Sequence, residues 1–209
     1  MDVSRLHHLK PIRLLGGTPH EAACDLALLR LAAYLKTIGD ADWEKFLSAA
    51  RHNLVDYYIH VLWDPSRHSF LNLPGDSVVV PNKISTLVEA GFALAALEGK
   101  DDLVEQYFLP AMASIMPAQV KQSGRLQGAI DQSIAGDHLS GRYFPYYVVR
   151  CVPALLATFL HKAKQAYLDA AINAMEFVFR CQLPDGSFPQ VLYANGRQTV
   201  EPRWIAGCG

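Results

Sequence analysis

Four prolines recur at nearly equal steps along the chain, and each opens an apolar run of helix-forming residues. They are Pro19, Pro81, Pro145 and Pro202, separated by 62, 64 and 57 residues. Proline suits the first turn of a helix, because its missing N–H would have no partner within the helix there. A fixed period of about 60 residues is typical of a repeated supersecondary unit. The spacing therefore predicts a repeat of helix, tight turn, second helix and long loop.

The loops between the predicted helices alternate between short and long. In an up-and-down array of antiparallel helices, alternate loops lie at the same end. Connections longer than about 12–15 residues without regular structure are usually functional or disordered. We therefore expect the functional residues on the face formed by the long loops. The predicted helices cover residues 20–37, 42–63, 84–97, 103–116, 146–161 and 167–181.

The predicted helices fall into two sets that differ in polarity. Helices 84–97 and 146–161 are apolar almost all round, which is typical of helices packed on every side. Helix 42–63 is amphipathic, with one apolar stripe. These patterns predict an all-α fold, an α/α toroid with the first helix of each pair in an inner ring. We expect an N-terminal extension, 1–18, and a toroid domain, 19–209, with hairpins at 19–80, 81–144 and 145–201 and the start of a fourth.

Composition excludes several classes of partner. The chain has 209 residues, a formal net charge of −1 and 19% charged residues, without the basic stripe of a nucleic-acid-binding protein. No apolar stretch is long and charge-free enough to span a bilayer, and the first residues lack the apolar centre of a signal peptide. We therefore expect a cytoplasmic protein with neither nucleic acid nor membrane as a partner.

Neither the cysteines nor the histidines form a recognisable metal motif. The cysteines make no CxxC pair, so we expect small core residues rather than a disulfide or zinc set. His52, Asp56 and His60 share a helical face that could hold a metal, but this face lies off the apolar stripe and should be solvated. We expect no metal and no cofactor. The four cysteines are Cys24, Cys151, Cys181 and Cys208.

A short motif in the third long loop carries a family resemblance. Gln182 followed by the Asp-Gly-Ser-Phe turn at 185–188 resembles the glutamine–aromatic repeat motif of terpenoid cyclase and protein prenyltransferase toroids. The same turn, with the following Gln190, also resembles six-hairpin glycosidases and toroidal polysaccharide lyases. The first resemblance implies that Asp185 braces a turn rather than acting as an acid.

Departures from these families favour the glycan-active group. The chain has neither the acidic DxDD motif of class II terpene cyclases nor a zinc cluster like that of prenyltransferases. Glycan-active toroids share no universal sequence motif, so the absence of a motif does not argue against that group. Closed members of both groups contain more hairpins than this chain, so we expect an incomplete ring. Either further hairpins of a longer protein or self-association would complete it.

The second long loop holds the densest group of candidate catalytic residues. A glycoside hydrolase needs two carboxylates flanking the scissile bond, and Asp131 with Asp137 could supply them. A lyase acting on uronates needs a base and a neutralising cation, and His138 or Tyr143 with Arg142 could supply those. The alternative is structural: Asp131 closes a turn, Asp137 caps the approach to a helix, and His138 is solvated.

Aromatic and basic residues of the same face are candidates for substrate binding. Arg150 lies inside an otherwise apolar helix, where an unpaired charge is costly, so it should bind a ligand or pair with Glu89 or a loop carboxylate. The tyrosines could stack on sugar rings, line a hydrocarbon pocket or belong to the core. The expected binding residues are Arg142, Tyr146, Tyr147, Arg150, Arg203 and Trp204.

Three functions remain open from the sequence. The leading one is a carbohydrate-active enzyme, a glycoside hydrolase or polysaccharide lyase, that binds a neutral or acidic glycan in the long-loop basin. The second is a terpenoid-cyclase-like or prenyltransferase-like enzyme that binds an isoprenoid. The third is a non-catalytic toroid that serves as a binding module. Paired carboxylates in the basin would favour the first, a deep aromatic pocket with one acid the second, and a basin without a close polar pair the third.

Overall fold

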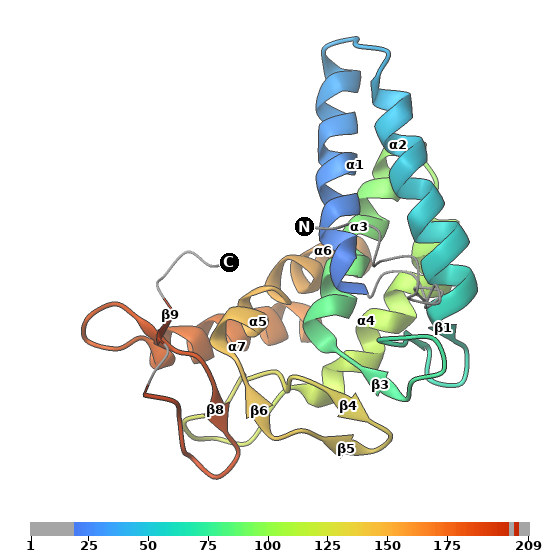
Figure 1. Cartoon of the computed structure of the whole chain (residues 1–209). Coiled ribbons are helices and arrows are strands. Elements are labelled where there is room, and N and C mark those ends of the chain that lie inside the picture. Colours follow the sequence, from blue (N-terminus) through green and yellow to red (C-terminus); the bar gives the residue numbers. More distant parts are fainter. Residues whose placement is uncertain (1–18, 201–202, 205–209) are drawn as a thin grey trace, which may run out of the picture.

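The computed structural model describes residues 19–200 and 203–204 (Figure 1). The expected N-terminal extension, Pro202 and Cys208 lie outside the described residues. The helical elements are η2 (Pro19–Glu21), α1 (Ala22–Thr37), α2 (Trp43–Arg51), η3 (His52–Leu62), α3 (Pro81–Glu98), η4 (Val104–Phe108), α4 (Leu109–Ile115), η5 (Met116–Ala118), α5 (Pro145–Val149), α6 (Val152–Lys162) and α7 (Gln165–Cys181).

The helices form three antiparallel pairs whose first members pack side by side. Helix α1 packs against α2 and α3, α3 packs against α4 and α6, and both α5 and α6 pack against α7 (Figure 1). Helix α3 is buried along most of its length, as expected for an inner helix. The arrangement confirms the predicted all-α toroid with an incomplete ring.

The repeat prolines stand where the periodicity predicts. Pro19 begins η2, and Pro81 and Pro145 are the first residues of α3 and α5, each buried at the start of an inner helical segment. The prediction of one continuous helix over 146–161 is wrong, since the chain breaks between α5 and α6. Pro153 explains the break, because it has no N–H to donate to the carbonyl of Val149.

Two outer helices contain π-helical segments that the sequence pattern does not predict. Segment η3 continues α2, and segment η4 precedes α4. For η4 the cause is local: Pro110 cannot donate a hydrogen bond to the preceding turn, so a wider turn forms before it.

The core lies between the inner and outer helices. Tyr58, Phe70 and Phe108 are fully buried there. Cys151 and Cys181 are buried as expected, but the expectation is wrong for Cys24, which is exposed on α1. Helix α1 lies at the open edge of the array, so part of its apolar surface has no neighbour among the described residues. Because of this open edge, an apolar helical run does not guarantee burial here.

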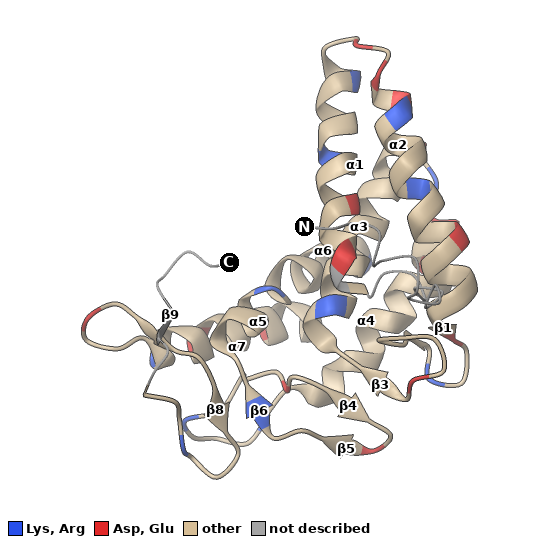
Figure 2. Ribbon diagram, in the orientation of Figure 1, with Lys and Arg blue, Asp and Glu red and all other residues tan. Residues whose placement is uncertain are grey.

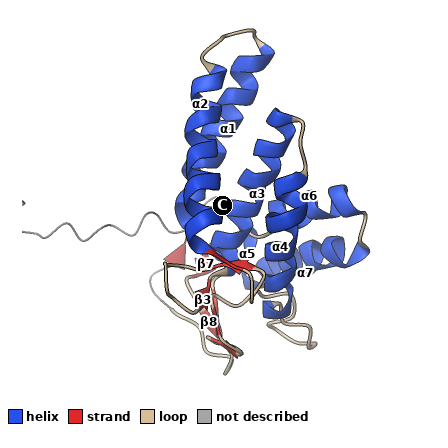
Figure 3. Cartoon of the chain, turned by 90° about the vertical axis from the view of Figure 1, so that its right-hand side faces the viewer, coloured by secondary structure: helices blue, strands red, loops and turns tan. Residues whose placement is uncertain are grey.

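Short antiparallel strands tie the long loops together at one end of the molecule, at the N-terminal ends of α3 and α5 (Figure 3). β3 pairs with β4, which links the first long loop to the second, and β6 pairs with β8, which links the second to the third. The strands are β1 (Trp63–Asp64), β2 (Ser69–Phe70), β3 (Val78–Val79), β4 (Ile134–Ala135), β5 (His138–Leu139), β6 (Arg142–Tyr143), β7 (Phe188–Pro189), β8 (Leu192–Tyr193) and β9 (Arg203–Trp204).

Charges of both signs are interspersed over the helices and loops, without a stripe of one sign (Figure 2). The acidic and basic residues are nearly equal in number, 20 against 19, which accounts for the small net charge. Among the described helices, none combines the length and apolar character that a membrane span requires.

Candidate functional site

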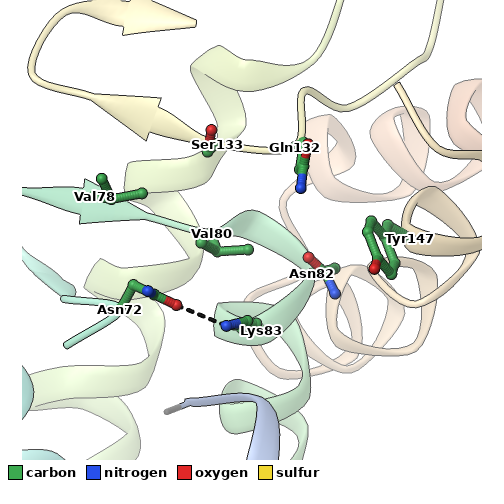
Figure 4. A pocket seen from close by; sticks show the side chains of 8 residues that line it. All are labelled: Asn72, Val78, Val80, Asn82, Lys83, Gln132, Ser133 and Tyr147. Atoms are coloured by element: carbon green, nitrogen blue, oxygen red, sulfur yellow. Dashed lines mark hydrogen bonds between the residues drawn. The ribbon is translucent and has the colours of Figure 1, made fainter. Parts of the chain in front are cut away.

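A pocket of about 410 Å³ opens at the end of the array where α3 and α5 begin (Figure 4). Its volume lies within the usual range of small-molecule sites, roughly 300–1,000 Å³. The lining mixes amide, hydroxyl, ammonium and aromatic groups with two valines. The lining residues are Asn72, Val78, Val80, Asn82, Lys83, Gln132, Ser133 and Tyr147.

Two inner helices and two long loops supply these side chains. Asn82 and Lys83 follow Pro81 in the first turn of α3, and Tyr147 comes from α5. Gln132 and Ser133 directly precede β4, across the pocket from Asn82 (Figure 4). The pairing of β3 with β4 brings the two loops together, so residues some fifty positions apart share one cavity.

Lys83 is the charged residue of the lining. Its ammonium donates a hydrogen bond of 2.7 Å to Asn72 Oδ1 (Figure 4). Burial lowers the pKa of Lys83 from its usual 10.5, and the negative charge of Glu21 partly opposes this shift. Among the described residues that line the pocket there is no carboxylate and no imidazole. Of the lining residues that the structure describes, Lys83 carries the charge, and the others offer neutral hydrogen-bonding or apolar groups.

Gln132 presents an unsatisfied acceptor beside the pocket. Its side-chain Oε1 is buried and has no hydrogen-bond partner among the described residues. Its backbone N–H donates to the carbonyl of Arg142 at 2.9 Å, which fixes the chain at that point. A buried acceptor without a partner costs free energy, so a donor from a bound molecule would stabilise this arrangement.

Asp131 holds the loop that carries Gln132. The side chain is only 1% exposed. Its Oδ1 accepts hydrogen bonds from the N–H groups of Ser133 and Ser140, both at 3.0 Å, and from the Ser140 hydroxyl at 2.5 Å. Its Oδ2 accepts one from the N–H of Gly141 at 2.7 Å. Both carboxylate oxygens are thus engaged in closing the turn, the structural alternative considered for this residue.

The other candidate acid and base lie on a separate hairpin. Asp137 occupies the turn between β4 and β5, His138 begins β5, and both are exposed. The tip of this hairpin extends away from α5 and β6 (Figure 1). The structure therefore does not bring Asp137 and His138 to the pocket, and it separates the exposed Asp137 from the buried Asp131.

Tyr143 and Arg142 form β6, on opposite faces of the strand. Tyr143 is buried, and its pKa is raised by burial and by the negative charge of Asp131. Arg142 is exposed and lies opposite Tyr193 of β8. Neither residue lines the pocket.

Arg150 contacts a neutral side chain of the neighbouring inner helix. Its Nη2 donates to the hydroxyl of Thr86 on α3 at 3.3 Å. The expected partner Glu89 pairs instead with Arg30 of α1. Arg150 thus bridges two inner segments, and its half-buried side chain does not line the pocket.

The expected aromatic residues divide between the pocket and its surroundings. Tyr147 lines the pocket, and its ring lies 5.5 Å from that of Tyr146 and 4.9 Å from that of Phe144, measured between centroids. The backbones of Arg203 and Trp204 pair with β7, while their side chains lie outside what the structure describes.

The metal face considered on the second helix is solvated. His52 and Asp56 interact at 2.6 Å, and both are exposed, as is His60. Within the described residues, no three His, Cys, Asp or Glu side chains lie close enough together to hold a metal ion.

Most of the pocket residues escape sequence reasoning. Asn82 and Lys83 fall on the expected face, and their position directly after a repeat proline is the signal that could have singled them out. Asn72, Gln132 and Ser133 carry no such signal. Their place at the pocket depends on β-pairing between two loops that have no regular pattern of their own.

Comparison with known proteins reveals the fold and no sequence family. No protein-family model matches the chain, and no curated protein matches its sequence. Among solved structures, the chain superimposes on a cellobiose 2-epimerase from Bacillus thermoamylovorans with a TM-score of 0.69 at 11% identity, covering 87% of this chain and 47% of that one. It has the α/α-toroid fold.

Two further matches lead to the same fold. A sugar epimerase from a ruminal bacterium gives a TM-score of 0.67 at 12% identity, covering 86% of this chain and 48% of that one. An endoglucanase from Klebsiella pneumoniae, a family 8 glycosyl hydrolase, gives a TM-score of 0.62 at 15% identity, covering 87% of this chain and 57% of that one. All are toroids of the six-hairpin glycosidase-like type. The present toroid spans about half the length of the structures it matches.

Proposed function

We propose that this chain is the sugar-binding part of a carbohydrate-active enzyme. The observation that carries the proposal is the pocket in which the amides of Asn82 and Gln132, the Lys83 ammonium and the Tyr147 ring converge. Amide and ammonium groups form hydrogen bonds with hydroxyls, and an aromatic ring offers an apolar surface to the carbon face of a sugar.

The structural neighbours support the same class. They are named as a sugar epimerase, a cellobiose 2-epimerase, a mannose isomerase and an endoglucanase. Because one fold hosts many functions, this likeness adds weight only beside the pocket's own chemistry. An isoprenoid ligand has less support, since most of the lining residues that the structure describes are polar and Tyr147 is the single aromatic one among them.

For the reaction, the lining supports chemistry other than glycoside hydrolysis. Hydrolysis by the common route needs two carboxylates around the scissile bond, and none of the described lining residues supplies one. A lyase, the other reaction that we expected, needs a cation beside a sugar carboxylate, and Lys83 provides a cation. Of the expected site residues, we retain Tyr147 as a sugar contact and Asp131 as the residue that positions Gln132.

A non-catalytic binding module is the second candidate. It is favoured by the same observation, that the lining residues within the described part of the chain include no carboxylate and no histidine to transfer a proton. Turnover distinguishes the two candidates, because a binding module would retain a sugar without converting it.

The proposal is tested by titrating the whole chain with a panel of mono- and disaccharides, using calorimetry and saturation-transfer NMR. Tyr147→Ala should abolish or strongly weaken binding. Tyr34→Ala, at an exposed position of α1, is the matched control and should bind like the parent chain. A chain that binds no member of the panel, or a Tyr147→Ala variant that binds normally, would overturn the proposal. Product analysis of the same mixtures reports whether the sugar is converted.

A further inference from the structure

We infer that two copies of this chain associate head to tail and close a toroid of six helical pairs. In this assembly α1 of each copy packs against α6 and α7 of the other. Three features carry the inference: two exposed apolar faces at opposite edges of the array, their matching height along the repeat, and the way successive helical pairs pack within the chain. The described residues of the pocket belong to one copy, so the proposed sugar binding does not depend on this association.

The first face is an uncharged stripe along α1. Its residues follow one another at steps of three, four, three and four positions, the spacing of a coiled-coil seam. They lie opposite the buried side of α1, and all are exposed in the part of the chain that the structure describes. A row of exposed apolar side chains is typical of a surface that contacts another protein. The α1 stripe consists of Cys24, Ala27, Leu31, Tyr34 and Ile38.

The second face lies at the other edge of the array, on α6 and α7 (Figure 3). Each of these helices exposes two large apolar side chains that no described residue covers. The two helices are antiparallel and pack against each other, so together they offer a broad surface to a further helix. The α6–α7 face consists of Leu156, Leu160, Ile172 and Phe179.

The packing within the chain shows how a further inner helix would lie on the α6–α7 face. Helix α3 contacts both α1 and α2, and α6 contacts both α3 and α4. Each inner helix therefore sits against both helices of the preceding pair. By the same rule the next inner helix would sit against α6 and α7. A second copy of α1 is an inner helix with an uncovered apolar stripe, so it fits this position.

The repeat places the two faces at the same height. Tyr34 of the α1 stripe lies 15 residues beyond Pro19. Leu160 of the α6–α7 face lies the same 15 residues beyond Pro145. Both prolines begin inner helical segments, which run in the same direction from the end that carries the long loops. Parallel packing of α1 against α6 of another copy therefore brings Tyr34 beside Leu160.

Two copies match the size of a closed ring. The chain has three helical pairs and covers 48% and 47% of the two epimerase structures, which are toroids of the six-hairpin type. Since six pairs complete the circle in such a toroid, three pairs turn through about half of it. Head-to-tail contacts form a ring only when the rotation per copy closes, and here it closes at two copies. The two-fold axis then runs along the inner helices, so both pockets open on the same face of the ring.

A two-stranded contact between two α1 stripes is the alternative. It would use the coiled-coil spacing of the α1 stripe but would leave the α6–α7 face exposed. The head-to-tail contact covers both faces at once and is therefore favoured.

The test is the mass of the whole chain in solution, measured by sedimentation equilibrium over a range of concentrations. We expect a species of twice the chain mass of 23.1 kDa. Tyr34→Glu and Leu160→Lys, each alone, should weaken the dimer about tenfold or more, because each places an unpaired charge in the contact. The two substitutions together should restore the dimer at least in part, since opposite charges then face each other between the copies. Val61→Glu, at an exposed apolar position of η3, is the matched control and should leave the dimer intact.

Three results would overturn the inference, with circular dichroism used to verify that each variant is folded. One is a parent chain that stays monomeric at every concentration. Another is a dimer that Tyr34→Glu dissociates and Leu160→Lys does not, since this would indicate contact between two α1 stripes. The third is open-ended growth into larger oligomers, which would contradict a closed ring. Sugar titration of the same variants reports separately on the proposed function.

Discussion

Asp25 is a buried carboxyl on α1 that the sequence does not single out. Its side chain is 3% exposed and accepts a hydrogen bond of 2.8 Å from Asn53 Nδ2. Burial, with a contribution from the charge of Glu21, raises the pKa of Asp25 from 3.8 to about 6. The folded state thus binds the proton more tightly than the unfolded state does, so folding is favoured most while the carboxyl is protonated in both states.

A pH-dependent stability follows from this raised pKa. The contribution of Asp25 to the free energy of unfolding is fully present below about pH 4 and is lost as the pH rises through about 6. Asp25→Asn, which keeps an acceptor for Asn53, should raise the free energy of unfolding by about 1–3 kcal/mol at pH 8 and change it little at pH 4. Urea unfolding at pH 4, 6 and 8 measures this. An equal effect at all three values would contradict the assignment.

Asp131 provides a prediction that links stability to binding. Asp131→Asn retains one acceptor oxygen but turns the other into a donor, so the N–H of Gly141 or the Ser140 pair loses its partner. The loop that carries Gln132 should loosen, with faster amide hydrogen exchange at Ser133 and Gly141 and sugar affinity weakened by about three- to tenfold.

The control for this variant is another turn carboxylate. Asp185 accepts from the N–H and hydroxyl of Ser187 in the third long loop and does not line the pocket. Asp185→Asn should leave sugar affinity unchanged. If both variants weaken binding equally, the effect of Asp131 is a general loss of order rather than the positioning of Gln132.

Residues near in sequence need not share a site, and the candidate catalytic carboxylates illustrate this. Asp131 and Asp137 lie six positions apart, yet one is buried under its own turn and the other stands at a hairpin tip. Their spacing alone could not reveal the hairpin, because β4 and β5 are two residues each. The role of Asp185 as a turn residue, by contrast, could be inferred, since proline, aspartate and glycine at adjacent positions specify a turn locally.

At the level of elements, the contact between α3 and η4 depends on a glycine. A Cβ at Gly91 would collide with the ring of Phe108, which is fully buried and has no room to move. Gly91→Ala should therefore lower the free energy of unfolding by about 1–3 kcal/mol despite the better helix propensity of alanine. Thermal unfolding measures the loss. Ala96→Ser, at an exposed position on the same helix, should change stability by less than about 0.5 kcal/mol.

The helical elements were predictable because their signal is local. Apolar periodicity and proline position identify α1, α3 and α7 within a few residues of their ends. The sequence did not predict the interruption between α5 and α6 or the π-helical segments, because these depend on which hydrogen bonds a proline removes and on how the neighbouring residues repack. Pocket residues on loops were the least predictable, since pairing between distant segments places them.

For the molecule as a whole, the incomplete ring leaves apolar surface on the described helices. Leu160 of α6 is 81% exposed and Phe179 of α7 is 67% exposed. The double variant Leu160→Gln, Phe179→Gln should keep the free energy of unfolding within about 1 kcal/mol of the parent and reduce concentration-dependent association. Sedimentation velocity over a range of concentrations, beside urea unfolding, measures both. A large loss of stability would mean that these side chains pack in the folded chain.

Helix α3 joins the pocket to the core within a single element. Its first turn supplies Asn82 and Lys83, and the remainder is among the most buried parts of the chain. Substitutions at those two positions therefore affect folding as well as ligand binding. Substitutions at the loop residues Asn72, Gln132 and Ser133 should have little effect on packing. Selection for a new sugar would act first on the loops, and an engineer seeking altered specificity should randomise them while leaving α3 untouched.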